Sequence, residues 1–233
     1  MKKRAFTLAE ILITLGIIGV VSALTIPTLV KRNTNETHVE QLKKVYATLS
    51  EAAETAMQEN NVNDLSETEL GDKTGNNGPK NFLNKYFKVS IDCDTKMTPC
   101  FADTYKGMDG NPNTLLGENY NWGYSNSVSL ADGTAICLQA RMDTRSEWGW
   151  DANSDYHTYV SVFVDVNGPK GPNIFGRDFF TFYLFSDGKI GESYSMQVNH
   201  ANDSRTACID GSANSYGGGC FTTIMLDGWK MDY

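Results

Sequence analysis

The sequence contains few of the residues, and none of the motifs, from which common catalytic sites are built. Its only histidines, His38, His157 and His200, lie far apart in a chain of 233 residues. It has no G-x-S-x-G, phosphate-binding loop or dinucleotide-binding fingerprint. Its five cysteines form no C-x-x-C pair, which argues against a structural zinc site. We therefore expect a protein that is not an enzyme, with no catalytic residue and no required cofactor.

Clustered positive charge is also scarce. The chain has 20 basic and 28 acidic residues, which gives a formal net charge of −8, and its clear basic run is Lys2 to Arg4. Binding to nucleic acid depends on clustered lysine and arginine side chains that neutralise phosphates. The composition therefore does not predict a nucleic acid as a partner.

Residues 11–30, by contrast, contain no charge at all. An apolar helix of about 20 residues crosses the hydrocarbon core of a bilayer. The basic run at Lys2 to Arg4 holds the preceding end in the cytoplasm by the positive-inside rule. We expect a single transmembrane helix over about residues 8–30, with the rest of the chain on the far side of the membrane.

Two ordinary interpretations fit part of this segment. A secretory signal peptide would explain the basic start, the apolar run and a cleavage site after Ala23. A plain uncleaved anchor would explain the length. Both leave Glu10 without a reason, because a charged side chain inside the membrane costs about 2.5–3.5 kcal/mol on insertion scales.

The sequence AFTLAE at residues 5–10, followed by an apolar helix, resembles the signal of prepilins, the precursors of type IV pilins and of type II secretion pseudopilins. Glu10 occupies the place of the family's characteristic glutamate. Gly19 and Pro27 match the glycine and the helix-bending proline of the family's apolar segment. The family usually has glycine before its cleavage point, where this chain has Ala5.

The resemblance covers about residues 1–60 and implies how this segment is processed and used. A prepilin peptidase would cut between Ala5 and Phe6, remove the leader 1–5 and methylate the new amine of Phe6. In a filament of parallel helices, Glu10 of one subunit would neutralise the Phe6 amine of its neighbour, because neither charge is stable alone in lipid. The implied partners are further copies of the chain, other pilin-like subunits, the peptidase and an inner-membrane assembly platform. The implied location is the bacterial inner membrane, with the C-terminal domain in the periplasm or outside the cell.

A helical pattern continues after the membrane segment. Apolar residues recur at every third or fourth position, at Val39, Leu42, Tyr46, Leu49, Ala53 and Ala56. We expect one helix over residues 6–60, bent or loosened at Pro27, whose amphipathic second half packs on a globular domain over 61–233. His38 is expected to be an exposed residue near the membrane surface.

The globular part contains segments typical of strands. Four segments are rich in β-branched and aromatic residues, at 133–140, 159–166, 179–185 and 189–196. The sequence SDGK at 186–189 predicts a hairpin turn. We expect an α+β fold in which a small antiparallel sheet of three or four strands packs on the long helix. The resemblance to pilins implies the same layout.

The cysteines indicate local cross-links. Cys93 lies close in sequence to Cys100, and Cys208 to Cys220, and both pairs lie among turn residues, which suits disulfides in an oxidising compartment. Cys137, within TAICLQA, is expected to be a buried free thiol. The alternative is that all five cysteines are reduced and buried.

The stretch VDVNGPKGPNIFGRDFFTF at 164–182 resembles a segment of pseudopilins, particularly the major type, in which a neighbouring loop can bind calcium. Asp165, Asn167 and Asp178 could supply oxygen ligands to Ca²⁺. In the alternative interpretation, the same residues only stabilise turns, which asparagine and aspartate side chains do without a metal.

The C-terminal tail contains the apolar run FTTIML at 221–226, which we expect to be a strand. The region bounded by Cys208 and Cys220 resembles the disulfide-bounded region of type IV pilins. Tryptophans near polar residues, at Trp122, Trp148 and Trp150, could suit a carbohydrate surface, although such aromatics usually pack over a core.

Three functions follow in order. The stretch at 164–182 favours a pseudopilin that drives type II protein secretion. The C-terminal cysteine region favours a type IV pilus subunit for adhesion, motility or DNA uptake. The third alternative is a secreted carbohydrate-binding module, released by signal peptidase after Ala23.

Overall fold

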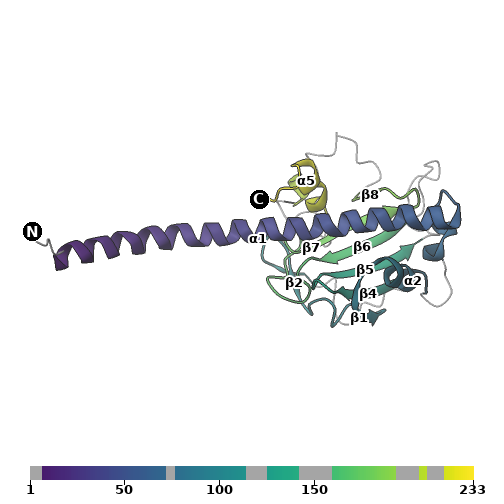
Figure 1. Ribbon diagram of the computed structural model, residues 1–233, viewed down its shortest axis with the longest axis horizontal. Helices are drawn as coiled ribbons and strands as arrows, with labels where there is room; N and C mark the ends of the chain where they lie inside the picture. The colour runs from purple at the N-terminus through teal and green to yellow at the C-terminus, as the bar shows by residue number, and fades with distance from the viewer. Residues whose placement is uncertain (1–6, 72–76, 114–124, 142–158, 193–204, 209–217) are drawn as a thin grey trace, which may run out of the picture. The chain divides into compact units, whose positions relative to one another are not determined.

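A computed structural model of the chain describes residues 7–71, 77–113, 125–141, 159–192, 205–208 and 218–233. The chain divides into two compact units, Met1–Thr37 and His38–Tyr233. One continuous helix, α1 (Leu8–Asn60), contributes to both units (Figure 1). The long N-terminal helix predicted from the sequence is therefore confirmed.

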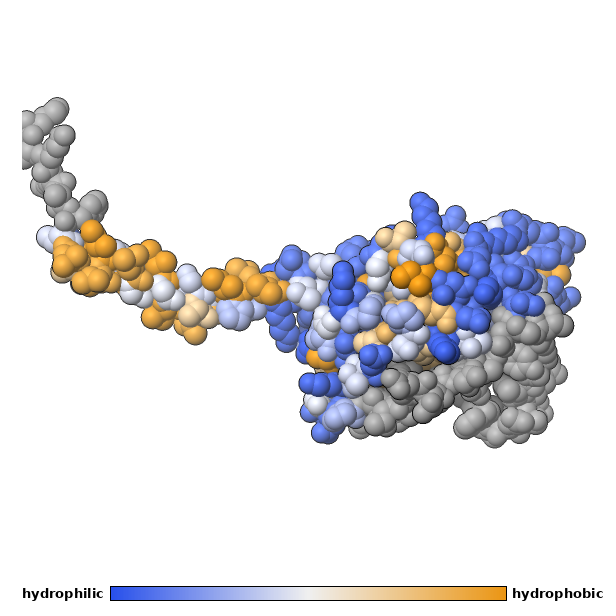
Figure 2. Space-filling view, turned by 90° about the horizontal axis from the view of Figure 1, so that it is seen from below, coloured by the Kyte–Doolittle hydropathy of each residue, from blue (hydrophilic) through white to orange (hydrophobic). Residues whose placement is uncertain are grey.

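The two parts of α1 differ in what covers their side chains. Between Leu8 and Val30 the large apolar side chains are 45–75% exposed, and Figure 2 shows apolar residues gathered along this segment. The later part buries one stripe, formed by His38, Val39, Leu42, Val45, Leu49, Ala52, Ala53 and Ala56. The predicted change from an apolar to an amphipathic helix is present.

His38 corrects one expectation. Its side chain is only 6% exposed, and its Nδ1 lies 3.1 Å from the carbonyl oxygen of Arg177. The expectation failed because it judged the residue by its polarity. Position 38 lies four residues before Leu42, on the same face of the helix, and its polar ring nitrogen has a backbone partner there.

Short helices connect α1 to the sheet. They are η1 (Leu65–Glu67), η2 (Glu69–Gly71) and α2 (Asn77–Tyr86). Phe82 and Leu83 of α2 are fully buried in the same core as the second part of α1. The short helix expected within residues 81–89 is thus present but begins earlier in the chain.

Six strands form one antiparallel sheet in the order β1-β4-β5-β6-β7-β8. They are β1 (Val89–Asp94), β4 (Ser125–Leu130), β5 (Ala135–Arg141), β6 (Tyr159–Asp165), β7 (Phe179–Phe185) and β8 (Ile190–Gly191). A second, small sheet joins β2 (Tyr105–Lys106) to β3 (Pro112–Asn113). The α+β class with an antiparallel sheet is confirmed.

The prediction of three or four strands was too low. The segments at 133–140, 159–166 and 179–185 contain β5, β6 and β7, and the turn at 186–189 joins β7 to β8. Only Ile190–Gly191 of the segment 189–196 forms a strand within the described residues, and 193–196 lie outside them. β1 and β4 were missed because they contain serine, asparagine and aspartate, which are rare in strands.

Each face of the sheet contributes to a separate apolar core. Phe180, Phe182 and Leu184 of β7 belong to the core that α1 covers. Phe179 of the same strand belongs to a second core, which also contains Phe101. Alternate residues of a strand point to opposite faces, so β7 contributes to both.

The C-terminal apolar run is a helix, α5 (Cys220–Leu226), and the predicted strand is wrong. Phe221 stacks on Phe182 of the sheet, with ring centroids 4.3 Å apart. Glu192 accepts backbone N–H groups at the start of α5, from Gly219 at 2.8 Å and Thr222 at 3.0 Å. These tertiary contacts outweigh the strand propensity of a short run of threonine and isoleucine.

Candidate functional site

The first described residues form a cap on α1. The Glu10 Oε2 atom accepts hydrogen bonds from the backbone N–H and the hydroxyl of Thr7, both at 2.8 Å. In return, the Glu10 N–H donates to the Thr7 hydroxyl oxygen at 3.2 Å. This reciprocal arrangement of threonine and a glutamate three residues later is a capping box, which satisfies backbone donors at a helix start.

The capping box gives Glu10 a partner within its own chain. The sequence analysis treated this carboxylate as unpaired in a single subunit and looked for its partner only in a neighbour. The pattern T-x-x-E at residues 7–10 is the signal that would have identified the cap. Glu10 therefore has a local role that is independent of any filament.

An apolar surface follows the cap. Polar side chains within it bond to the helix itself: Thr14 Oγ1 donates to the Glu10 carbonyl oxygen and Thr25 Oγ1 donates to that of Val21, each at 2.9 Å. Such bonds leave the hydroxyls satisfied without water. Among the described residues, α1 is the one helix long and apolar enough to cross a membrane.

Pro27 lies inside α1, and the helix remains continuous through it. Proline has no N–H, so one hydrogen bond of the preceding turn is missing there. The predicted bend at Pro27 stays a prediction. Ala5 and Phe6, the expected cleavage site, lie outside the described residues.

Comparison with protein families decides what this segment is. Residues 1–26 match the prokaryotic N-terminal methylation motif. The chain carries a prepilin-type signal. Searches of curated proteins and of solved structures each gave no match.

The prepilin-type signal and the cap occupy the same place. The matched residues include the predicted cleavage site and Glu10, and they end one residue before Pro27. This signal is that of type IV pilins and pseudopilins, and together with the apolar helix it fits a membrane-anchored subunit. The long helix followed by an antiparallel sheet is consistent with a pilin-like fold.

The structure contains two disulfides in the globular unit. They join Cys93 to Cys100 and Cys208 to Cys220. Cys137 is a buried free cysteine, and burial raises the pKa of its thiol to about 12. Because reactivity requires the thiolate, Cys137 is chemically inert at neutral pH and serves as a core residue.

The candidate calcium residues lie in the loop between β6 and β7 and at its ends. Asp165 is fully buried, and its Oδ2 accepts a 2.5 Å hydrogen bond from the Tyr105 hydroxyl. Asp178 is also fully buried, and its two oxygens accept the N–H groups of Asn173 at 2.7 Å and Ile174 at 2.5 Å. Burial is the main cause that raises the pKa of Asp165, to about 8, and it also raises the pKa of Asp178.

Asn167 completes the predicted set. Its side-chain N–H donates to the Gly171 carbonyl oxygen at 3.2 Å, while its Oδ1 is buried without a hydrogen-bond partner. Among the described residues, no three His, Cys, Asp or Glu side chains gather as a metal site would require. The two aspartates hold the loop through protein donors, as the turn interpretation predicts, and calcium binding stays a prediction.

The tryptophans of the carbohydrate alternative, Trp122, Trp148 and Trp150, lie outside the described residues. The site that sequence reasoning missed in the described part is Glu192, whose carboxylate holds the start of α5. It is followed by no recognisable motif, and its partners lie more than 25 residues further along the chain. Only the folded structure brings them together.

Proposed function

We propose that this chain is a filament-forming subunit, cleaved between Ala5 and Phe6 and held in the inner membrane by α1. The match of residues 1–26 to the N-terminal methylation motif carries the proposal. The exposed apolar part of α1 supports it, since such a surface is stable only in lipid or against other helices. In this proposal the chain has a structural role and no catalytic one.

Glu10 acts twice in this scheme. In the separate subunit its carboxylate bonds to Thr7, which limits the cost of holding it at the edge of the membrane. In the filament it pairs with the Phe6 amine of a neighbouring subunit. The second interaction joins opposite charges in a low-dielectric environment and forms at one axial offset, so it fixes the register of the helices.

The finer role that we propose is that of a pseudopilin in type II protein secretion. The stretch at 164–182, which suggested this role, forms a loop closed by the buried Asp165 and Asp178. The alternative is a type IV pilus subunit, and one observation supports it. The cross-link between Cys208 and Cys220 bounds a C-terminal region in the manner of type IV pilins.

A deletion strain separates the two roles. For a pseudopilin, we expect the deletion to abolish secretion of exoproteins, which accumulate in the periplasm, while surface fibres seen by electron microscopy are unchanged. Loss of long fibres with normal secretion would show the pilus role instead. Complementation with the intact gene is the control for both measurements.

A further inference from the structure

A groove of about 660 Å³ lies where α1 ends. One wall is the last part of α1 and the residues that follow it, and the other is the turn between β7 and β8, represented by Asp187. A volume of this size lies within the range of small-molecule sites. The groove belongs entirely to the globular unit and lies far along the chain from the prepilin-type signal.

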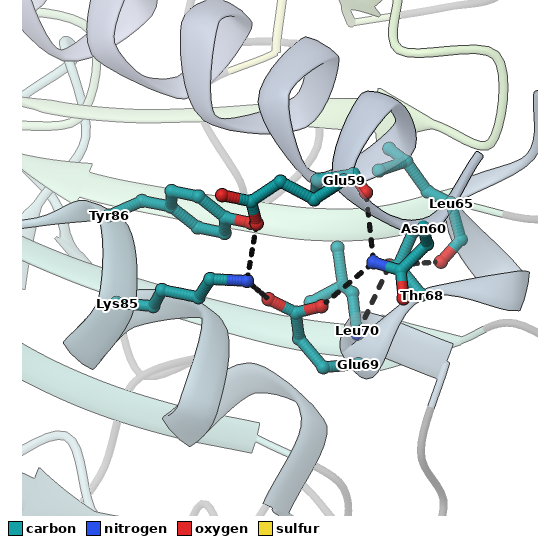
Figure 3. Close-up of polar contacts among 9 residues, drawn as sticks. Glu59, Asn60, Leu65, Thr68, Glu69, Leu70, Lys85 and Tyr86 are labelled. Atoms are coloured by element: carbon teal, nitrogen blue, oxygen red, sulfur yellow. Dashed lines mark hydrogen bonds and ion pairs between the residues drawn. The ribbon is translucent and has the colours of Figure 1, made fainter. Parts of the chain in front are cut away.

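Several interactions fix the end of α1 (Figure 3). Lys85 of α2 forms ion pairs with Glu59 at 2.6 Å and with Glu69 at 3.2 Å. The Tyr86 hydroxyl donates to Glu59 at 2.9 Å, and the Asn60 side chain donates to the carbonyl oxygen of Ala56. A network of several contacts holds its members more firmly than a single exposed pair does. The helix end is therefore rigid.

The two walls are also joined to each other. The Leu65 N–H donates to the Ser186 carbonyl oxygen at 2.9 Å, which ties the segment after α1 to the turn after β7. Gly188 of that turn lies so close to α1 that a Cβ atom would meet the Met57 Cε at 2.9 Å. The groove therefore exists before any ligand binds, which lowers the entropic cost of binding.

The polar groups that line the groove have no partner of their own. The side-chain amides of Gln58, Asn61 and Asn63 make no hydrogen bond within the part of the chain that the structure describes, and neither does the Glu54 carboxylate. These side chains are exposed. They are available to a ligand, unlike Glu59 and the other members of the network.

The lining limits the chemistry of the ligand. Asp187 is already paired with Lys189 at 2.7 Å, so Glu54 is the one carboxylate of the lining left without a cation. Met57 and Val62 add a small apolar surface. Each carboxamide offers both donors and an acceptor, as a hydroxyl does. An apolar ligand would leave the three amides unpaired, and an anion would be repelled by Glu54.

We propose that this groove binds a saccharide without negative charge, either neutral or amino-substituted. The amides of Gln58, Asn61 and Asn63 bond to the hydroxyls of the sugar, and Glu54 accepts from a hydroxyl or an amino group. Met57 and Val62 pack against the C–H face of the sugar ring. A basic peptide would have only the Glu54 charge to bind and would leave the amide donors unused, which is why a saccharide is the better fit.

The test uses the full chain in a zwitterionic detergent, because a sugar-based detergent would compete for the groove. Saturation-transfer NMR is recorded with hexasaccharides of glucose and mannose, typical of external polysaccharides, and of N-acetylglucosamine, a unit of bacterial wall glycan. Glucosamine, oligogalacturonate and a lysine-rich peptide complete the set of probes. We expect binding of at least one neutral or amino probe, and the arm that binds identifies the source.

Two substitutions locate the binding. Gln58→Ala removes one exposed amide, and Asn61→Gly removes another while keeping the backbone relaxed, since Asn61 has a φ of 54°. Their combination should weaken binding about tenfold or more, as expected for the loss of two hydrogen bonds. Gln41→Ala, the same substitution on α1 outside the groove, should leave the affinity unchanged, and melting temperatures show that each variant is folded.

Three results would overturn the proposal: no response from any neutral or amino probe, equal binding by the Gln58→Ala variant and by wild type, or preference for oligogalacturonate or the peptide. The inference does not depend on the proposed filament. A Glu10→Ala variant in detergent should bind the saccharide as wild type does, so a failure of either idea is seen separately.

Discussion

At the scale of single residues, Glu10 has two candidate partners, the Thr7 cap in its own chain and an amine in a neighbouring subunit. Glu10→Gln distinguishes them, because glutamine also completes a capping box but carries no charge. We expect the variant to insert in the membrane and to be cleaved, yet to form few or no filaments. The measurement is the amount of subunit in sheared or cross-linked filaments, determined by immunoblotting.

Glu36→Gln provides the control for that experiment. Glu36 is an exposed carboxylate on the same helix, paired with Arg32 at 2.8 Å. Surface pairs of this kind contribute little, about 0–1 kcal/mol. Normal filaments from Glu10→Gln would show that helix capping alone explains the glutamate.

Asp165 makes a prediction about pH. Burial raises the pKa of its carboxyl from 3.8 to about 8, and the like charge of Asp178 adds to this effect. Between pH 4 and 8 the folded protein holds a proton that the unfolded chain has released. Stability from this group is therefore greatest below about pH 4 and falls as the pH rises toward 8. Asp165→Asn should make this fall shallower, by up to about 1.4 kcal/mol per pH unit.

The measurement is the free energy of unfolding in guanidinium at pH 5 and pH 7.5, with the protein in detergent. Asparagine keeps an oxygen that can accept the Tyr105 hydroxyl, so the variant should fold. Asp103→Asn, which removes an exposed carboxylate, is the matched control. If Asp165→Asn retained the full slope, another group would be responsible for the pH dependence.

At the scale of elements, α5 depends on contacts that are distant in sequence. Glu192 accepts three backbone N–H groups at its start, from Gly219, Phe221 and Thr222. Glu192→Ala should lower the free energy of unfolding by about 1–3 kcal/mol, because buried donors lose their acceptor. Faster hydrogen exchange over 220–226 would locate the change, and Glu51→Ala, at an exposed position of α1, is the control.

The disulfide between Cys208 and Cys220 limits that effect, since it holds the first residue of α5 in place. A cross-link over a loop of this length stabilises by about 3 kcal/mol in the chain-entropy model. The variant should therefore remain folded under oxidising conditions. Unchanged hydrogen exchange in α5 would contradict the role of Glu192 as its cap.

The elements also show what a sequence can and cannot predict. The period of α1 and the β-branched segments of β5, β6 and β7 were sufficient, because these elements bury continuous apolar faces. β4 was missed because Ser125, Asn126 and Ser127 are buried in the middle of the sheet despite their polarity. Their polar groups are tolerated there because neighbouring strands and segments surround them, which no local pattern reveals.

The same limit applies to the candidate sites. The T-x-x-E cap was local and could have been found from residues 7–10. The groove at the end of α1 joins residues near position 58 to Asp187, and no sequence pattern links them. The Asp165–Tyr105 bond likewise joins a strand end to a short strand far earlier in the chain. Prediction succeeded for contacts near in sequence and failed for those that the sheet topology creates.

At the scale of the whole molecule, the chain has two units with different solvents. The unit Met1–Thr37 carries the prepilin-type signal and an exposed apolar helix, which suits lipid and later the interior of a filament. The unit His38–Tyr233 has its own cores and two disulfides, which suits an oxidising compartment. Cleavage of the leader is the step that connects these two environments to assembly.

The mass of the mature N-terminal peptide, determined by mass spectrometry of the protein from its own membranes, tests that step most directly. The account predicts a chain that begins with N-methylated Phe6. Ala5 in place of the usual glycine should slow cleavage without moving its position. A mature chain that begins at Leu24, after the alternative site at Ala23, would contradict the account, because both Glu10 and the apolar helix would then be discarded.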